Sequence, residues 1–410
     1  MSLEFNKVVE QVQTMGRYLG HLSQGLEGKL ALALERFYDT TDLEAVHERI
    51  KLVRESSVSG YRGATPAPKP YDELICGIGG LPEAPSSATL VAVDGSQIYP
   101  DPHGAVPYYL INMGVFAYYY GEPRLPYQFT EPMLNYSEAM LQDRDGRLIT
   151  NQTVNARRSV MEMQWLAKEA WTRRSEPRPL IGFHDGGLLK FFGANDVAGA
   201  QQIEKDYLDA LRMMLDSGSI LAGYLDRPRS TYLISLLHLL QLDPGQVNDA
   251  NLRSNGDMEG LTDDMLFAHV LEPGERSAVM TQNSPQNRTY KDKNDTGDFE
   301  IAFFYVNVSN GSRPTIARID IPMWVARDKE AVAALHALII AQCAIQGRKH
   351  YPYALTRADE LAYVSSIEKS QLDEMIRVEM MRNQLEPEAS NKLQTKGLAR
   401  GDKRQHRLGA

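Results

Sequence analysis

The sequence predicts an α/β protein with a mixed sheet flanked by helices, a helical N-terminal appendage and a basic C-terminal tail. From residue 88 onward, short apolar runs typical of buried strands alternate with segments whose apolar residues follow helical spacing. Hydrophobic residues make up 43% of the chain and charged residues 24%, which is enough apolar material for a core. We expect an appendage plus linker over 1–85, a main domain over 86–385 and a tail over 386–410.

The first 57 residues are predicted to be helical. Apolar residues recur there at steps of three and four, including Val8, Val12, Met15 and Leu19. The following stretch, 59–74, is rich in Gly, Pro and Ala and is typical of a linker.

The next part of the chain, 88–240, carries the alternation of strand and helix. Strands are expected over 88–93, 108–120, 179–184 and 219–225, and helices over 153–174, 199–216 and 230–240. The first strand is expected to stop at the turn Asp94-Gly95-Ser96.

The C-terminal part is more mixed. We expect a helix over 262–271, a strand over 275–281, a mobile polar loop over 282–298, a strand pair over 300–308 and 314–321, and helices over 328–346 and 358–382. The stretch 391–410 has a net charge of +5 and no apolar periodicity, which predicts disorder.

Composition excludes several classes of protein. The two cysteines, Cys76 and Cys343, cannot build a disulfide framework or a cysteine-based zinc site. No apolar run approaches the roughly 18 residues of a membrane span, and we expect no signal peptide, no membrane association and a cytoplasmic location. The net charge of −9, or −14 without the tail, argues against a surface that binds any nucleic acid indiscriminately.

Two apolar runs end in Asp-Gly: VAVDGS at 91–96 and GFHDGG at 182–187. A carboxylate at the end of a buried strand projects where a site can form, and the glycine permits a tight turn. Asp94 and Asp185 on neighbouring strands could hold a divalent metal through hard oxygen ligands. Alternatively, each Asp-Gly is an ordinary turn dipeptide.

A third acid, Glu162, lies beside the apolar stripe of the helix predicted over 153–174. A carboxylate there is costly unless it is paired or binds a metal. The alternative is a salt bridge with Arg158, one helical turn earlier.

The block HYPYALTRADELAYV carries two more candidates, Tyr351 and Asp359. Asp359 is expected in the first turn or two of a helix, where the helix dipole tolerates an anion. Taken alone, Tyr351 could simply be an aromatic residue that packs in the core, and Asp359 could be an ordinary acidic residue at the start of a helix.

In their order along the chain, the blocks VAVDGS, RRSVMEMQWL, HDGG, AGYLDRPRSTYL, GERS, IARIDIP and YPYALTRAD resemble the NurA nuclease domain family, over roughly residues 88 to 370. The resemblance implies an RNase H-like core and a ring-like homodimer. It also implies a manganese-dependent 5′→3′ exonuclease and single-strand endonuclease that works with the hexameric ATPase HerA, a DNA translocase, in end resection.

Carried over from the family, the metal-binding and catalytic carboxylates match Asp94, Glu162 and Asp185, and the late catalytic tyrosine matches Tyr351. The sequence departs from the family at two places. Asp359 stands where histidine is common, and as a catalytic metal ligand it would suit Mn²⁺ or Mg²⁺. An expected lysine after the middle strand is missing, so Arg227 or Arg229, together with Arg158, is expected to contact the DNA backbone, unless these arginines are simply solvated.

The predicted activity is therefore hydrolysis of phosphodiester bonds at single- and double-stranded DNA ends, without sequence specificity. Ser96 is expected to orient its loop, and His184 to be structural. An alternative is a catalytically degenerate adaptor for a DNA-translocating ATPase ring. A metal-dependent phosphatase is disfavoured, because it would leave Glu162 and the Tyr-Pro block unexplained.

Overall fold

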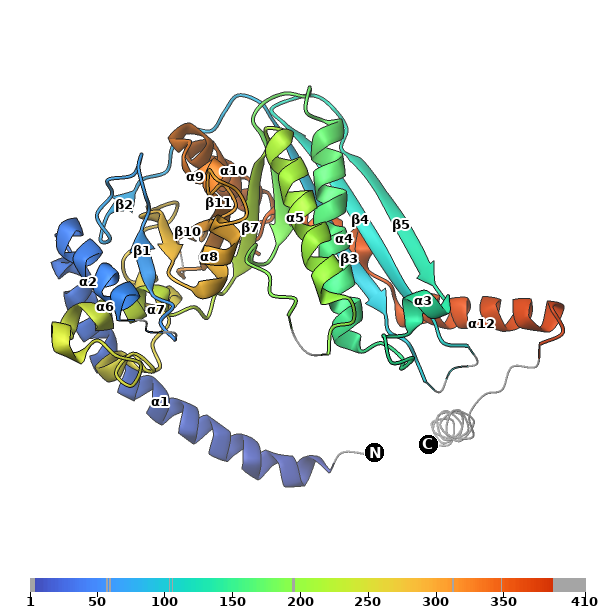
Figure 1. The fold of residues 1–410 in the computed structure, drawn as a ribbon, viewed down its shortest axis with the longest axis horizontal. Helices are drawn as coiled ribbons and strands as arrows, with labels where there is room; N and C mark the ends of the chain where they lie inside the picture. Colours follow the sequence, from blue (N-terminus) through green and yellow to red (C-terminus); the bar gives the residue numbers. More distant parts are fainter. Residues whose placement is uncertain are drawn as a thin grey trace. The chain divides into compact units, whose positions relative to one another are not determined.

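The computed structural model describes residues 4–385 apart from 57, 59, 103, 105, 194, 195, 312 and 348. The predicted tail over 386–410 lies outside the described residues. The chain divides into two compact units, each an α/β assembly as predicted (Figure 1). Unit 1 comprises Met1–Ser86, Asp185–Leu189 and Ile220–Tyr353, and unit 2 comprises Ser87–His184, Lys190–Ser219 and Ala354–Ala410.

The sheet of unit 2 is built around a long central strand. Its strands are β3 (Ala88–Ile98), β4 (Tyr109–Tyr120), β5 (Tyr127–Asn135) and β6 (Leu180–Asp185). β4 runs antiparallel to the whole of β3, and β5 pairs antiparallel with β4. β6 runs parallel to β3, and its register ends at the pair Val93↔His184.

Helices cover both faces of this sheet. They are α3 (Glu138–Leu141), α4 (Asn151–Thr172), α5 (Ala200–Asp216), α11 (Tyr353–Ala362) and α12 (Ser366–Arg382). α4 and α5 lie side by side on one face (Figure 1), where Leu166 and Met214 both pack at Gly182. α11 packs on the other face, against β4.

Unit 1 contains a second set of strands in the order β1-β9-β10-β11-β7, with β8 joining β2 to β10. They are β1 (Ala64–Pro66), β2 (Ile78–Gly79), β7 (Ile220–Asp226), β8 (Arg276–Ser277), β9 (Met280–Gln282), β10 (Ile301–Asn307) and β11 (Ile316–Pro322). The predicted strand pair is confirmed: β10 and β11 are antiparallel and fully buried.

The helices of unit 1 are α1 (Phe5–Asp39), α2 (Leu43–Glu55), α6 (Tyr232–Gln241), α7 (Asp263–Phe267), α8 (Pro285–Lys291), α9 (Met323–Ala326) and α10 (Lys329–Ile345). Apolar side chains from α1, α2, α6, α7 and the neighbouring strands form one core cluster. At its centre, Phe267 stacks on Tyr305 and meets the edge of Phe37.

Several predicted boundaries differ in the structure. β3 continues four residues past Asp94, because Gly95 to Ile98 keep pairing with β4. The expected mobile loop 282–298 contains α8, which Asn287 fixes by donating to the Ile301 oxygen and accepting from the Ile301 N–H. The helix expected over 358–382 is two helices, α11 and α12, and the expected linker contains β1, which pairs with β9.

Among the residues that the structure describes, no helix has the length and apolar character required to cross a lipid bilayer.

Candidate functional site

Asp94 lies inside β3, at the point where one of the two neighbouring strands stops pairing. Its partner across the antiparallel ladder is Gly114 of β4. A Cβ atom on Gly114 would lie 2.4 Å from the Ala358 oxygen and 2.5 Å from the Ala362 nitrogen of α11. Because directly opposed residues of an antiparallel pair project from the same face, the Asp94 side chain lies on the face that α11 covers.

Glu162 reaches β3 from the opposite face. A Cβ atom on Gly95 would lie only 3.0 Å from Oε1 of Glu162 and 3.0 Å from Cγ of Arg158. Glu162 is 5% exposed, so its carboxylate is held in the interior beside the strand position that follows Asp94. The bare backbone of Gly95 therefore provides the room that brings this helix carboxylate next to the strand.

Arg158 holds this arrangement together. Its guanidinium donates to the Gly95 oxygen at 2.7 Å and lies 3.5 Å from Oε1 of Glu162. The salt bridge offered as the alternative role of Glu162 is therefore present. It does not exclude a metal site, because carboxylate oxygens are hard donors that can also bind a divalent ion.

Asp359 lies on α11, the helix that covers the Asp94 face, and its side chain is exposed. α11 begins at Tyr353, earlier than the start expected near residue 358, so Asp359 lies in the second turn of the helix. The end of α11 is fixed to the sheet, because the Ala362 oxygen accepts from Ser96 Oγ and from Asn112 Nδ2. Ser96 therefore lies within β3 and fixes the end of α11, rather than orienting a loop as expected.

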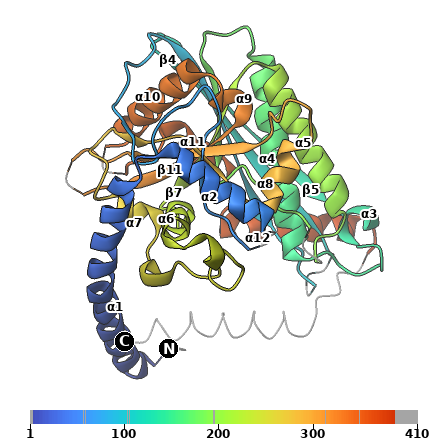
Figure 2. The ribbon, with the colours of Figure 1, turned by 60° about the vertical axis from the view of Figure 1, so that its left-hand side comes forward.

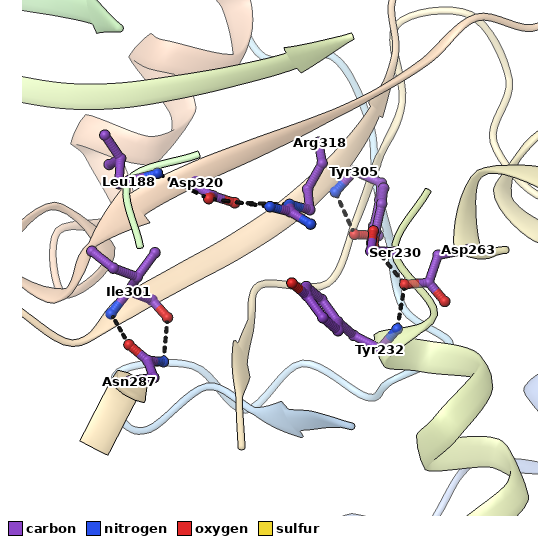
Figure 3. A network of polar contacts seen from close by, with 10 residues as sticks. Leu188, Ser230, Tyr232, Asp263, Asn287, Ile301, Tyr305, Arg318 and Asp320 are labelled. Carbon is purple, nitrogen blue, oxygen red and sulfur yellow. Dashed lines mark hydrogen bonds and ion pairs between the residues drawn. The ribbon is translucent and has the colours of Figure 1, made fainter. Parts of the chain in front are cut away.

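In unit 1, Asp185 begins a tight turn that two backbone N–H groups fix by hydrogen bonds. The Gly186 N–H donates to the Tyr224 oxygen of β7 at 2.8 Å. The Leu188 N–H donates to Oδ2 of Asp320 at 3.2 Å (Figure 3). These contacts fix the backbone that carries the exposed Asp185 side chain.

Asp320 and its partner Arg318 are functional candidates that were not predicted from the sequence, although the block IARIDIP contains both. Both are buried in β11, and the guanidinium donates to the carboxylate from Nε at 2.9 Å and from Nη2 at 3.3 Å (Figure 3). The available signal was the pair of opposite charges two residues apart in the apolar strand IARIDIP. Alternation along a strand puts such a pair on one face.

Tyr351 packs edge-on against Tyr224, with ring centroids 5.0 Å apart at 80°. The Tyr224 hydroxyl donates to the His350 oxygen at 3.2 Å, and burial raises its pKa well above the ordinary value. Tyr224 is therefore a neutral hydrogen-bond donor that fixes the backbone just before Tyr351.

The remaining candidates divide into exposed and buried groups. Arg227 and Arg229 are exposed, and Arg227 has a positive φ of 47° in the loop after β7. His184 is buried, and burial lowers its pKa well below the ordinary value, so the ring is neutral at physiological pH. His184 is therefore suited to the structural role expected for it.

Asp94, Glu162, Arg158 and Asp359 thus belong to unit 2, whereas Asp185, Tyr351, Arg227 and Arg229 belong to unit 1. Over the described part of the chain, no three His, Cys, Asp or Glu side chains are grouped so that they could hold a metal ion. The donor types themselves, carboxylates beside a glycine gap, are those that suit Mg²⁺ or Mn²⁺. The four-carboxylate ligand set remains a prediction.

One of the solved structures compared with this chain is similar enough to share its fold. The NurA nuclease from Sulfolobus solfataricus is similar with a TM-score of 0.51 and 12% identity, covering 92% of this chain and 98% of that chain. The Ciona intestinalis endonuclease V in complex with DNA aligns with a TM-score of only 0.29 and 12% identity, over 80% of this chain and 96% of that one. None of the curated proteins matches this sequence.

The family comparison covers most of the region just described. The model of the NurA domain matches residues 88–364, which include Asp94, Glu162, Asp185, Tyr351 and Asp359. The chain therefore belongs to the NurA family.

Proposed function

We propose that this chain is a divalent-metal-dependent DNA nuclease, with 5′→3′ exonuclease and single-strand endonuclease activity, that acts in DNA end resection. In this proposal, Asp94, Glu162, Asp185 and Asp359 are the metal-binding carboxylates and Mn²⁺ or Mg²⁺ is the cofactor. A HerA-type hexameric ATPase is the partner that moves DNA, and the nuclease is a homodimer. Membership of the NurA family supports the reaction class.

The observation that carries the proposal is the arrangement around Gly95. Glu162 is buried beside Gly95, the residue that follows Asp94 in β3, and a Cβ atom on Gly95 would lie only 3.0 Å from its Oε1. The strand thus carries Asp94 toward one face of the sheet and leaves room on the other face for Glu162.

The bound ion would supply the chemistry that activates water and stabilises charge on the leaving oxygen. The protein's own residues hold the carboxylates in place. Arg158 and Gly95 fix Glu162, the anchored end of α11 fixes the backbone near Asp359, and Asp320 fixes the turn after Asp185. Tyr351 would orient water or stack on a base, and Arg158, Arg227 and Arg229 would contact backbone phosphates, a mode that positions DNA without reading its sequence.

Degradation of end-labelled single- and double-stranded DNA in Mn²⁺ tests this function. The wild-type protein is expected to degrade both, and Asp94→Asn and Glu162→Gln are expected to lose about 100-fold or more in rate. The matched control is Glu169→Gln. Glu169 lies seven residues along the same helix, is equally buried and pairs with Arg173, so its loss should affect stability rather than the rate per folded molecule.

The adaptor alternative makes a different prediction for the same assay. A degenerate nuclease fold would degrade neither DNA in any divalent ion, while still stimulating or recruiting a DNA-translocating ATPase. Equal rates for the wild-type protein and Asp94→Asn would likewise contradict the proposed mechanism.

A further inference from the structure

Tyr224 contacts two segments that carry candidate site residues. It lies in β7, at the position paired with Ile319 of β11, and its side chain is completely buried (Figure 2). Its backbone oxygen accepts a hydrogen bond from the turn that follows Asp185, and its hydroxyl donates to the segment that carries Tyr351. All of these residues belong to unit 1.

The backbone of β7 holds the turn after Asp185. The Gly186 N–H donates to the Tyr224 oxygen at 2.8 Å. A Cβ atom on Gly223 would lie only 2.5 Å from the Gly186 oxygen, so glycine allows the strand and the turn to come this close. Because these contacts do not involve the Tyr224 side chain, a substitution of that side chain leaves them in place.

The side chain of Tyr224 holds the second segment by two contacts. Its hydroxyl donates to the His350 oxygen at 3.2 Å, and its ring meets the Tyr351 ring edge-on, with centroids 5.0 Å apart. His350 has a φ of 50°, in the left-handed region that residues other than glycine rarely adopt, so surrounding contacts must hold it there. The hydroxyl of Tyr224 therefore stabilises the unusual backbone conformation directly before Tyr351.

The Tyr224 hydroxyl has a second hydrogen-bonding partner, the buried Cys343 thiol of α10. Since the hydroxyl gives its own hydrogen to His350, the thiol is the donor in this second bond. The hydroxyl is thus oriented toward His350 from the opposite side. Phenylalanine would fill the same space in the core, so packing alone does not explain the polar end of this side chain.

We propose that Tyr224 is a positioning residue of the candidate nuclease site. Its hydroxyl holds Tyr351 in the orientation that the reaction requires, while its backbone holds the turn after Asp185. The inference rests on the proposed function, in which Tyr351 is a catalytic residue. Because Tyr224 is completely buried, it acts through Tyr351 and does not itself touch the DNA.

Steady-state kinetics on labelled single-stranded DNA in Mn²⁺ test the proposal. Tyr224→Phe keeps the ring and loses the hydroxyl, and it should lower kcat about 10-fold with little change in KM, because a misplaced catalytic group slows the reaction step. The matched control is Tyr108→Phe, which also loses one hydroxyl bond, the 2.6 Å contact to Asp373 in unit 2. This control should keep the kcat of the wild type.

A double variant separates positioning from general damage to the fold. If Tyr224 acts through Tyr351, then Tyr224→Phe should lower kcat no further in a Tyr351→Phe background. The same loss in that background would overturn the inference. A kcat for Tyr224→Phe that equals the kcat of Tyr108→Phe would also overturn it.

Amide hydrogen exchange of the protein without DNA or metal provides a measurement that does not depend on activity. Loss of the hydroxyl bond should make exchange around residues 350–353 roughly 5-fold faster in Tyr224→Phe, and Tyr108→Phe should leave it unchanged. Unchanged exchange in Tyr224→Phe would overturn the inference. A wild-type protein that leaves DNA intact would instead overturn the proposed function, and exchange would still decide whether the hydroxyl holds this segment.

Discussion

Arg318 and Asp320 form a buried two-point ion pair on one face of β11, and the same carboxylate accepts the backbone N–H of Leu188. The pair therefore joins β11 to the turn that follows Asp185. Arg318 also lies 5.1 Å from the centre of the Tyr232 ring, so its guanidinium is enclosed by an aromatic face as well as by its carboxylate.

Removing one partner of this pair should be costly. Asp320→Ala leaves the Arg318 charge buried without compensation and is expected to lower the free energy of unfolding by about 3–5 kcal/mol, measured by urea denaturation. The double variant Arg318→Met/Asp320→Leu should recover much of that loss, because it removes both charges. The control, Glu55→Ala, breaks the exposed pair with Lys51 and should have little effect. If Asp320→Ala lowers the free energy of unfolding as little as the control does, then it does not leave a costly uncompensated charge on Arg318.

The contact between Gly95 and Glu162 makes a second prediction. Gly95→Ala adds a Cβ atom 3.0 Å from Glu162 Oε1 and 3.2 Å from Met113 Sδ, so it should lower the free energy of unfolding by about 1–3 kcal/mol. Nuclease activity per folded molecule should also fall, because Glu162 must move. Gly80→Ala is the control, since a Cβ atom there meets nothing within 4 Å.

A double-mutant cycle separates this clash from a general effect of alanine in β3. In a Glu162→Ala background, the added methyl group of Gly95→Ala has more room, so its cost should shrink. Strictly additive losses in urea denaturation would show that Glu162 is not the group that Gly95 accommodates.

The sequence predicted the alternation of strands and helices well, because long apolar periodicities are local. It placed the end of β3 at Asp94-Gly95, where local turn preference is strong, yet pairing with β4 carries the strand on to Ile98. That pairing depends on residues 110–114, which a reading of the local segment does not include. α8 was missed for a related reason: Asn287 fixes it by contacts to Ile301, fourteen residues away.

The candidate site also could be predicted from the sequence only where local features were sufficient. Asp94 and Glu162 were identifiable, because each is a carboxylate beside a strongly apolar segment. The function of Gly95 as the gap for Glu162 was not, since it depends on how α4 crosses β3. The hydrogen bond from the Leu188 N–H to Asp320 could not be predicted either, because the two residues lie far apart in the sequence.

Asp263 predicts a pH dependence of stability. This fully buried carboxylate accepts the N–H groups of Tyr232, Leu233 and Ile234 at the start of α6 and the hydroxyl of Tyr305. Burial raises its pKa to about 6, against an opposing effect of these hydrogen bonds. Since the folded state holds the proton more tightly than the unfolded state, this group should make the protein less stable as pH rises from about 4 to about 6.

The measurement is urea denaturation of the wild type and Asp263→Asn across that range. A rise of about two pKa units corresponds to about 3 kcal/mol, so the stability advantage of the wild type over the variant should shrink by about that amount toward neutral pH. Asp263→Asn should be less stable than the wild type at low pH, because its amide group faces backbone donors. A constant difference across the range would show that Asp263 does not titrate there.

Asp359 allows a test of metal preference at the position where the family commonly has histidine. A carboxylate suits Mg²⁺ and Mn²⁺, whereas imidazole suits softer ions, so Asp359→His should lower the rate in Mg²⁺ about 10-fold more than the rate in Mn²⁺. Asp359→Asn is the matched control, because it keeps an oxygen donor and loses the charge, and it should lower the rates in both ions to a similar extent. Because Asp359 is exposed, neither change should alter the free energy of unfolding appreciably. An unchanged ratio of Mg²⁺ to Mn²⁺ rates in Asp359→His, with full activity in both ions, would remove Asp359 from the proposed ligand set and leave the three carboxylates Asp94, Glu162 and Asp185.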